Sequence, residues 1–223
     1  SCESTNDEAR AWAERGAPHG AVVTSDTQTR GRGQRGRVWH SEVKNLYYSV
    51  VLRPTWAMAE APPLTLAVGV ALCEAVRWFD SRATLKWPND VLIDGKKIAG
   101  ILTEGRAEGA GFSHVVVGIG CNLGEQAFPD ELVGIATWLD AERAALTATL
   151  CAALEARYEQ LARGERAGVL ADWQAQSAIF GRETTVSTPS GSIVGTPEAL
   201  DEDGALCVRT AGGVVRIVSG QLQ

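Results

Sequence analysis

The stretch ATLKWPNDVLIDGKKIAGILT, residues 83–103, decides the fold class of this chain. It contains three short β-prone runs, at residues 83–86, 91–93 and 98–103. Asp94-Gly95 stands between the last two runs, and this dipeptide is typical of a tight hairpin turn. An apolar run at residues 115–119 follows and ends in glycines. The centre of the chain therefore predicts a β-sheet.

Helical patterns flank this centre on both sides. Residues 64–79 carry apolar side chains at helical spacing, and residues 147–163 and 168–176 predict two more helices. Near the start of the chain, Thr5-Asn6-Asp7-Glu8 matches a capping box with Thr5 as the N-cap. Residues 46–52, LYYSVVL, predict a further strand. Together these elements predict an α/β domain over residues 1–178, with a mixed sheet and helices on one side.

Residues 179–223 differ from the preceding chain in their sequence pattern. Turn residues are frequent there, and short β runs lie between them at residues 183–186, 205–209 and 214–218. This alternation predicts a small β-barrel or sandwich. So short a segment could hardly stand alone, so we expect it to pack on the larger domain. The predicted domains are therefore residues 1–178 and 179–223.

Composition and charge exclude several classes of protein. The 223 residues include 21 basic and 27 acidic side chains, a formal charge of −6, and 45% are hydrophobic. These values exclude a disordered chain, a collagen-like repeat and a coiled coil. The most apolar segment, residues 64–79, is shorter than the roughly 20 residues that a membrane span needs. Scattered cysteines without a CxxC pair predict neither a zinc site nor a disulfide framework, so we expect a reducing, cytoplasmic location.

The octapeptide RGRGQRGR, residues 30–37, places four arginines in a net acidic protein. Its glycines let backbone amides approach a ligand and form an anion-binding nest. The arginines supply forked donors for phosphate or carboxylate, and Trp39 adds a flat face for stacking. A flexible RNA-binding tract or a solvated loop has the same composition. The octapeptide lies between two predicted strands of an apolar domain, residues 20–25 and 46–52, and this position argues against the flexible tract.

Three further stretches carry side chains suited to a ligand site. KWPND, residues 86–90, is by itself a turn between strands. In DGKKIAG, residues 94–100, strand alternation directs either Lys96 or Lys97 to the inner side of the sheet, where a lysine would neutralise charge at a phosphate. In GIGCN, residues 118–122, the glycines at a strand end indicate close approach of a ligand to the backbone.

Together these stretches resemble the biotin–protein ligases. Ser4-Thr5-Asn6, Gln28, the Gly-Arg loop with Trp39, KWPND, GKKIAGIL and GIGCN occur in the family's order and near its usual spacing. The resemblance is clear to about residue 123 and weaker beyond, where residues 181–223 look like the family's SH3-like C-terminal domain. It implies a class II synthetase-like α/β catalytic domain. It also implies a two-step reaction: ATP converts biotin to biotinyl-5'-AMP with release of pyrophosphate, and a lysine of the biotin carboxyl carrier domain of a carboxylase then takes the biotin.

The resemblance also implies which residues form the site. The catalytic set would be Lys97, which bridges the biotin carboxylate and the α-phosphate, with Arg32 and Asp90. Asp90 either orients the incoming lysine or binds magnesium. The residues implied to bind biotin are Ser4, Thr5, Asn6, Gln28, Gly31, Arg32, Lys97, Gly100, Gly118 and Gly120. The residues implied to bind ATP are Arg32, Arg35, Arg37, Trp39, Lys86, Asn89, Lys97 and Asn122. Mg²⁺ is implied beside the substrates ATP and biotin, without identified ligands.

Two departures from the family's pattern modify these expectations. The family's loop commonly reads GRGRxGR, whereas Gln34 here takes a position usually held by arginine. Arg30 offers partial compensation, and we expect a lid that holds the adenylate less tightly than in a typical member. The chain also starts directly at the Ser-Thr-Asn region, so we expect a ligase without the DNA-binding domain that some members carry.

Two other functions fit parts of the sequence. A lipoate or octanoate ligase or transferase shares the catalytic fold, but GRGQRGRVW and KWPND favour biotin. A non-catalytic RNA-binding module would use the Gly-Arg loop, and the charge of −6 argues against it. Members of the family are monomers or homodimers, and the sequence favours neither state.

Overall fold

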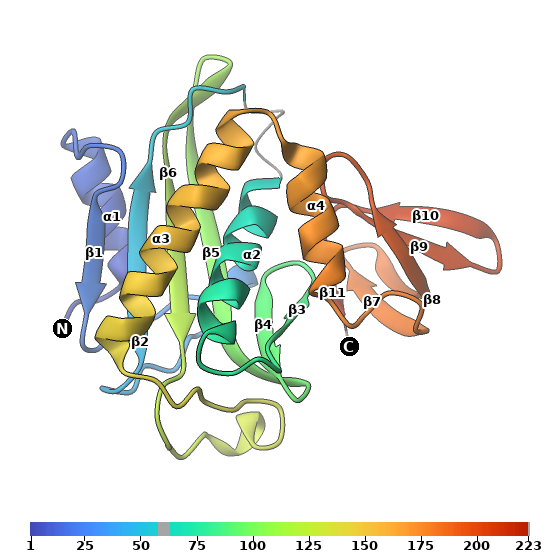
Figure 1. The fold of residues 1–223 in the computed structure, drawn as a ribbon, viewed down its shortest axis with the longest axis horizontal. Coiled ribbons are helices and arrows are strands. Elements are labelled where there is room, and N and C mark those ends of the chain that lie inside the picture. The colour runs from blue at the N-terminus through green and yellow to red at the C-terminus, as the bar shows by residue number, and fades with distance from the viewer. Residues whose placement is uncertain (58–62, 223) are drawn as a thin grey trace.

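The computed structural model describes residues 1–57 and 63–222, and its larger unit is built on a six-stranded sheet (Figure 1). The strand order is β1-β2-β6-β5-β4-β3, and every neighbouring pair is antiparallel. The bounds are β1 Val22–Ser25, β2 Leu46–Leu52, β3 Thr84–Lys86, β4 Asp90–Ile93, β5 Lys96–Glu108 and β6 Gly111–Cys121. The prediction of a mixed sheet is wrong, because β3 to β6 are joined by turns of two or three residues, and so short a turn reverses the chain each time.

Helices cover both faces of this sheet. They are α1 (Thr5–Glu14), α2 (Pro63–Arg77), α3 (Arg143–Ala162) and α4 (Arg166–Ala175). In Figure 1, α2 and α3 run across the face turned to the viewer, with α4 beside α2. Within residues 1–57 and 63–222, no helix combines the length and the hydropathy that crossing a membrane requires.

Strand alternation explains why α1 lies on the opposite face. Val51 and Val116 form a small cluster with the α1 residues Ala9 and Ala13. Their neighbours on the same strands, such as Val50, belong to the main core with α2, because successive side chains of a strand point to opposite faces. The prediction of helices on one side is therefore wrong for α1.

The main core lies between the sheet and α2. All seven residues of β2 are buried, and α2 is buried on nearly every side. The predicted strand at residues 46–52 agrees with β2 at both ends, and the helix predicted at residues 64–79 agrees with α2 to within two residues.

The C-terminal residues form a second antiparallel sheet. Its strands are β7 Thr184–Thr188, β8 Gly191–Leu200, β9 Leu206–Thr210, β10 Gly213–Ile217 and β11 Gln221–Leu222. Their order is β10-β9-β8-β7-β11. The predicted small β unit is confirmed, but over the described residues the two end strands do not pair with each other, so the sheet stays open and forms no closed barrel. Strands β8 and β11 were missed by the sequence analysis.

The second sheet is packed against the turn between β3 and β4. Trp87 in that turn is 3% exposed, and its Nε1 donates a hydrogen bond of 3.3 Å to the carbonyl of Gly204. On the α4 side, the backbone N–H of Leu200 donates to Gln174 Oε1 at 2.7 Å. The KWPND turn is therefore fixed between the two sheets.

Candidate active site

Two cavities meet at the side chain of Lys97. The first is a narrow slot of about 50 Å³ between α1 and the sheet. The second is a wider cavity of about 810 Å³ that reaches the C-terminal sheet. Both cavities are lined by Gly33, Gln34, Trp39, Asn89 and Lys97. A molecule in the slot and a molecule in the cavity would therefore both reach the ammonium group of Lys97.

Lys97 is held in place by its neighbours on two sides. Its Nζ lies 2.5 Å from Oδ1 of Asp90 and 5.4 Å from the ring centroid of Trp39. Its backbone N–H donates to the carbonyl of Ile135 at 2.8 Å, and its own carbonyl accepts from the N–H of Thr137 at 2.9 Å. Of the two lysines that the sequence offered, Lys97 is the half-buried one and faces the site, whereas Lys96 is exposed.

Ser4, Thr5 and Asn6 line one end of the slot, called its inner end here, and Ser49 lies behind Thr5 and Asn6. Ser4, Thr5, Asn6 and Ser49 are each at most 4% exposed. The Ser49 hydroxyl lies 2.7 Å from Asn6 Oδ1 and 2.8 Å from Thr5 Oγ1. Both the backbone N–H and the hydroxyl of Thr5 donate to Gln28 Oε1, at 2.8 and 3.1 Å. Since buried polar groups are costly unless they are paired, these hydrogen bonds hold the polar side chains in fixed positions beside the slot.

Thr5 does not cap α1 as the sequence predicted. The helix starts at Thr5 with Ser4 as the N-cap, and no side-chain cap bond forms. The Thr5 hydroxyl is engaged with Gln28 instead. The predicted capping box is therefore wrong, because the slot uses the side chain that the cap would have needed.

Glycines give the slot its width. A Cβ on Gly118 would lie 2.0 Å from Asn6 Oδ1, and one on Gly120 would lie 2.5 Å from Cε2 of Trp39. A Cβ on Gly100 would lie 3.1 Å from Lys97 Nζ and from the Trp39 ring. The Trp39 indole thus packs directly over Gly100 and Gly120, and its buried Nε1 has no hydrogen-bond partner among the described residues. Trp39 is the wall between the slot and the cavity.

Residues 31–39 form a loop over the slot, called the lid here. A short 3₁₀ turn, Gln34–Gly36, shapes its tip, and Arg35 adopts a left-handed conformation with φ of 58°. Arg35 Nη2 donates to Ser219 Oγ at 3.1 Å, and Arg37 donates to Gln221 Oε1. Two lid arginines are therefore bonded to the C-terminal unit, one just before β11 and one at its first residue.

The other two arginines of the Gly-Arg loop pair with carboxylates of the larger unit. Arg30 pairs with Glu3 at 3.3 Å, and Arg32 pairs with Asp7 and Glu104. Gly31 lines neither cavity. It joins the two ends of the lid, since its carbonyl accepts the Trp39 N–H at 2.9 Å and a Cβ there would lie 2.5 Å from the Trp39 carbonyl oxygen. All four arginines of the Gly-Arg loop therefore have partners within the fold.

The wider cavity is rich in cationic groups. Arg35, Arg37, Lys86 and Lys97 all line it. Burial lowers the pKa of Lys86, and the positive charges of Lys97 and Arg37 lower it further, while Asp90 raises it. Such a cluster is suited to a polyphosphate.

The two asparagines predicted to bind ATP are already bonded to the backbone. Asn89 Nδ2 donates to the carbonyl of Ile101 at 2.7 Å, and Asn122 Nδ2 donates to the carbonyl of Thr137 at 3.1 Å. Both still line the wider cavity. They therefore fix the cavity wall as well as facing a ligand.

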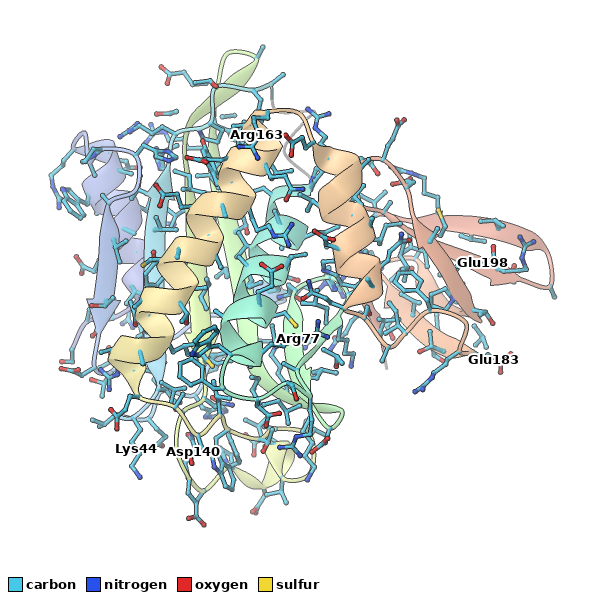
Figure 2. All side chains as sticks on the ribbon, in the orientation of Figure 1. Lys44, Arg77, Asp140, Arg163, Glu183 and Glu198 are labelled. Atoms are coloured by element: carbon cyan, nitrogen blue, oxygen red, sulfur yellow. The ribbon has the colours of Figure 1, made fainter. Side chains whose placement is uncertain are left out.

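The segment at residues 123–139 covers the far side of the cavity and was missed by the sequence analysis. Asn45, 1% exposed, accepts hydrogen bonds from the Leu123 N–H at 3.0 Å and from Gln126 Nε2 at 2.8 Å. The rings of Phe128 and Trp138 stack with centroids 6.3 Å apart. Figure 2 shows Lys44 and Asp140 at the end of the molecule where these loops gather. One feature of the sequence indicated such a contact: the polar Asn45 stands directly before the apolar strand β2.

Every other residue that the sequence analysis assigned to a site lines one of the two cavities. In the slot these are Ser4, Thr5, Asn6, Gln28, Arg32, Lys97, Gly100, Gly118 and Gly120. In the wider cavity these are Arg35, Arg37, Trp39, Lys86, Asn89, Asp90, Lys97 and Asn122. The sequence analysis missed Ser49, although a serine inside the apolar run LYYSVVL marks a buried polar position.

The donor sets disfavour a protein-built metal centre or a thiol nucleophile. Within residues 1–57 and 63–222, no three His, Cys, Asp or Glu side chains are grouped so that they could hold a metal ion. Burial raises the pKa of the Cys121 thiol to about 12. The nucleophilic thiolate form is therefore strongly disfavoured.

Comparison with known proteins gives a consistent relationship over the whole chain. The sequence model of the biotin/lipoate A/B protein ligase family matches residues 1–122, and that of the biotin protein ligase C-terminal domain matches residues 179–221. The bifunctional ligase/repressor BirA of Bacillus subtilis is 35% identical over 99% of this chain and 71% of its own. The biotin–[acetyl-CoA-carboxylase] ligase of Mycobacterium tuberculosis is 33% identical over 98% of this chain and 85% of its own. The structure of biotin protein ligase from Aquifex aeolicus in complex with biotin and ATP has a TM-score of 0.85 at 26% identity, and the match covers 100% of this chain and 94% of that one.

Proposed function

Because the chain belongs to the biotin/lipoate A/B protein ligase family and is an enzyme of the biotin–[acetyl-CoA-carboxylase] ligase type, we propose that it activates biotin with ATP and transfers it to a carrier domain. One observation carries this proposal: the slot and the wider cavity meet at Lys97. A carboxylate from one side and a phosphate from the other can share that single cation. The two-compartment geometry suits a reaction that joins an acid to a nucleotide.

In the first step, a biotin carboxylate oxygen attacks the α-phosphorus of ATP. The bond from the α-phosphorus to the bridging oxygen breaks, and pyrophosphate leaves with the electron pair. The chief obstacle is repulsion between two anions. Lys97 and the cluster of Arg35, Arg37 and Lys86 supply fixed positive charge where the negative charge develops.

In the second step, the neutral ε-amine of a carrier lysine attacks the acyl carbon of biotinyl-5'-AMP. The bond from the acyl carbon to the phosphate oxygen breaks, AMP leaves, and the amine loses a proton. Asp90 lies beside Lys97, and we assign it the role of orienting the incoming amine. The lid excludes water from the mixed anhydride between the two steps.

The inner end of the slot favours biotin over lipoate. The side chains of Thr5, Asn6, Gln28 and Ser49 form one hydrogen-bonded network there. The ureido ring of biotin carries two N–H donors and a carbonyl acceptor, which can exchange bonds with this network. The dithiolane of lipoate has no N–H donor and no carbonyl acceptor, so it would gain no such hydrogen bonds from these side chains.

Magnesium fits this site as part of the nucleotide substrate. Three carboxylates line the cavity, those of Asp90, Glu42 and Glu131. Asp90 is already paired with Lys97, and no caged set of metal ligands is found within the described residues. Mg²⁺ is typically held by one or two carboxylates together with substrate phosphates. We therefore assign Mg²⁺ to the polyphosphate of ATP.

The C-terminal unit, which we place at residues 179–223, would take part in lid closure. Ser219 and Gln221 hold Arg35 and Arg37, so two cations that face the phosphates depend on this unit for their position. The same bonds argue against a flexible RNA-binding tract, because the loop arginines are occupied within the fold.

Transfer to a protein is tested with a purified biotin carboxyl carrier domain. The domain is incubated with the enzyme, biotin and MgATP, and its mass and modified residue are read by mass spectrometry. The proposal expects one biotin on one lysine, and none when that lysine is replaced by arginine. An unmodified carrier, with adenylate accumulating on the enzyme, would contradict the transfer step.

A further inference from the structure

Arg32 of the lid is held by two carboxylates from two different elements. Its Nη1 and Nη2 donate to the two carboxylate oxygens of Glu104 on β5, both at 3.0 Å. Its Nη2 also donates to Asp7 Oδ1 on α1 at 2.8 Å. The three side chains are between 28% and 37% exposed. A two-pronged contact of this kind fixes the plane of the guanidinium as well as its place.

These contacts leave Arg32 able to bind a ligand. A guanidinium has five N–H donors, and three of them are used here. The Nε–H and one hydrogen on Nη1 remain. Arg10 also pairs with Asp7, at 2.7 Å, so the group of two arginines and two carboxylates has no net charge. The carboxylates therefore orient Arg32 without making the slot repel an anion.

The same group reaches the inner end of the slot. Glu104 Oε2 accepts a hydrogen bond from Asn6 Nδ2 at 2.8 Å, while Asn6 Oδ1 faces the hydroxyl of Ser49 at 2.7 Å. Asn6 therefore has a fixed orientation, with its amide nitrogen toward Glu104. One carboxylate thus holds both the lid and a side chain on which a ligand in the slot would rest.

We propose that Asp7 and Glu104 act as a latch on Arg32, which keeps the lid closed over the slot and couples closure to occupancy of the Asn6 end. The latch is formed by positioning residues that act through Arg32 and Asn6. One consequence of the latch rests on the proposed function: the closed lid retains biotinyl-5'-AMP until the carrier arrives. Asp7 acts on the lid alone, and Glu104 acts on the lid and the slot.

Hydrogen–deuterium exchange of the ligand-free protein tests the latch directly. The amides of residues 31–39 are followed in wild type, Glu104→Gln, Asp7→Asn and Glu14→Gln. Glu14 is the matched control, because it also lies on α1 and pairs with a β5 arginine, Arg106, away from the lid. Breaking one anchor lowers the cost of local opening, so we expect lid exchange to rise about fivefold in the first two variants. Unchanged lid exchange in both latch variants, or an equal rise in Glu14→Gln, would overturn the latch.

The rate of release of biotinyl-5'-AMP tests the consequence. We expect release to be about tenfold faster in Glu104→Gln and in Asp7→Asn. The reason is that each variant loses a charge-assisted hydrogen bond at a partly exposed site, and such a loss changes a rate by about a factor of ten. The KM for biotin should rise in Glu104→Gln alone, because only Glu104 bonds to Asn6. Adding Asp7→Asn to Arg32→Gln should change release by less than twofold, since Asp7 acts on the lid only through Arg32. Additive effects of these two changes would overturn the latch.

The two proposals fail in different ways. If wild type makes no biotinyl-5'-AMP, the proposed function fails while the exchange experiment still decides the latch. If wild type makes the adenylate and the latch variants match wild type in both lid exchange and release, the function stands and the latch fails.

Discussion

Lys97 Nζ lies 2.5 Å from Asp90 Oδ1, across the antiparallel pair of β5 and β4. The Asp90 side chain is 17% exposed and the Lys97 side chain 33%, so the pair is shielded but open to a ligand. Asp90 faces Gly100 in the strand register, and Gly100 leaves room for the lysine side chain to extend into the site. The carboxylate thereby fixes the cation at the point where the slot and the cavity meet.

Asp90→Asn tests this relationship, because it keeps the shape of the side chain and removes its charge. We expect the rate of adenylate formation to fall about tenfold, since Lys97 loses the partner that positions it. Biotin-dependent pyrophosphate release is the measurement. Asp94→Asn is the control, because Asp94 lies in the exposed turn next to the same strands and asparagine tolerates its positive φ. Equal rates of pyrophosphate release in wild type, Asp90→Asn and Asp94→Asn would show that Asp90 does not position Lys97 for the reaction.

Gly118→Ala tests the shape of the slot. The added Cβ would lie 2.0 Å from Asn6 Oδ1, so Asn6 must leave its bonds to Ser49 and Glu104. We expect biotin affinity to fall at least about tenfold and stability to fall by about 1–3 kcal/mol, the usual cost of overpacking. Calorimetric titration and thermal unfolding measure the two effects. Gly111→Ala on the same strand has its nearest neighbour at 3.7 Å, and a matching loss there would show that the effect is not specific to the slot.

Lys86 predicts how nucleotide binding depends on pH. Burial lowers the pKa of Lys86, so its positive charge is complete at low pH and is lost as the pH rises through that lowered pKa. We expect affinity for ATP to weaken with rising pH earlier than an ordinary lysine would allow. Lys86→Arg should move this weakening to higher pH, since arginine stays charged above pH ~12. KM for ATP as a function of pH measures both. Identical profiles for the two proteins would show that Lys86 does not contact the phosphates.

Gln34→Arg tests the departure in the lid sequence. Gln34 lines both cavities and brings no charge to them. We expect arginine at this position to slow the release of biotinyl-5'-AMP about tenfold through one more charge-assisted bond. A single-turnover release assay with a filter or rapid-mixing readout measures the rate. The same release rate in both proteins would mean that the side chain at this position does not touch the adenylate.

The elements that the sequence predicted well are those with one dominant pattern. The run LYYSVVL became β2 with both ends correct, and the apolar helical spacing of residues 64–79 became α2. Asp94-Gly95 forms the predicted turn, with φ of 50° and 76°. Local chemistry alone determines these features, so no knowledge of the rest of the fold was needed.

The features that were predicted wrongly or missed depend on contacts between residues far apart in the chain. The side of the sheet on which α1 packs depends on which face of β2 and β6 remains uncovered, and no local pattern of alanines contains that information. The Thr5 hydroxyl does not cap α1, because it donates to Gln28, which is 23 positions away in the chain. The segment at residues 123–139 takes its form from Asn45 and Lys97, so its own residues gave no signal.

The residues of the candidate site also fall into those that local motifs predicted and those that depend on tertiary contacts. The motif residues of the slot and the cavity could be named because each motif has a characteristic order and spacing. Ser49 and Glu104 could not, since a serine or a glutamate within a strand has many possible roles until its neighbours are known. Their function lies in hydrogen bonds to Asn6 and Arg32, which only the folded chain brings together.

The most direct test of the central claim is biotin-dependent release of pyrophosphate from ATP by wild type, Lys97→Ala and Lys96→Ala, with lipoate as the competing acid. The account predicts release with biotin and little with lipoate, a loss of at least about 100-fold in Lys97→Ala from removing a preorganised charge, and near wild-type release in Lys96→Ala. Lys96 is the adjacent exposed lysine and controls for the fold of the strand. Release supported by lipoate in place of biotin, or undiminished release by Lys97→Ala, would contradict the claim that biotin and ATP meet at Lys97.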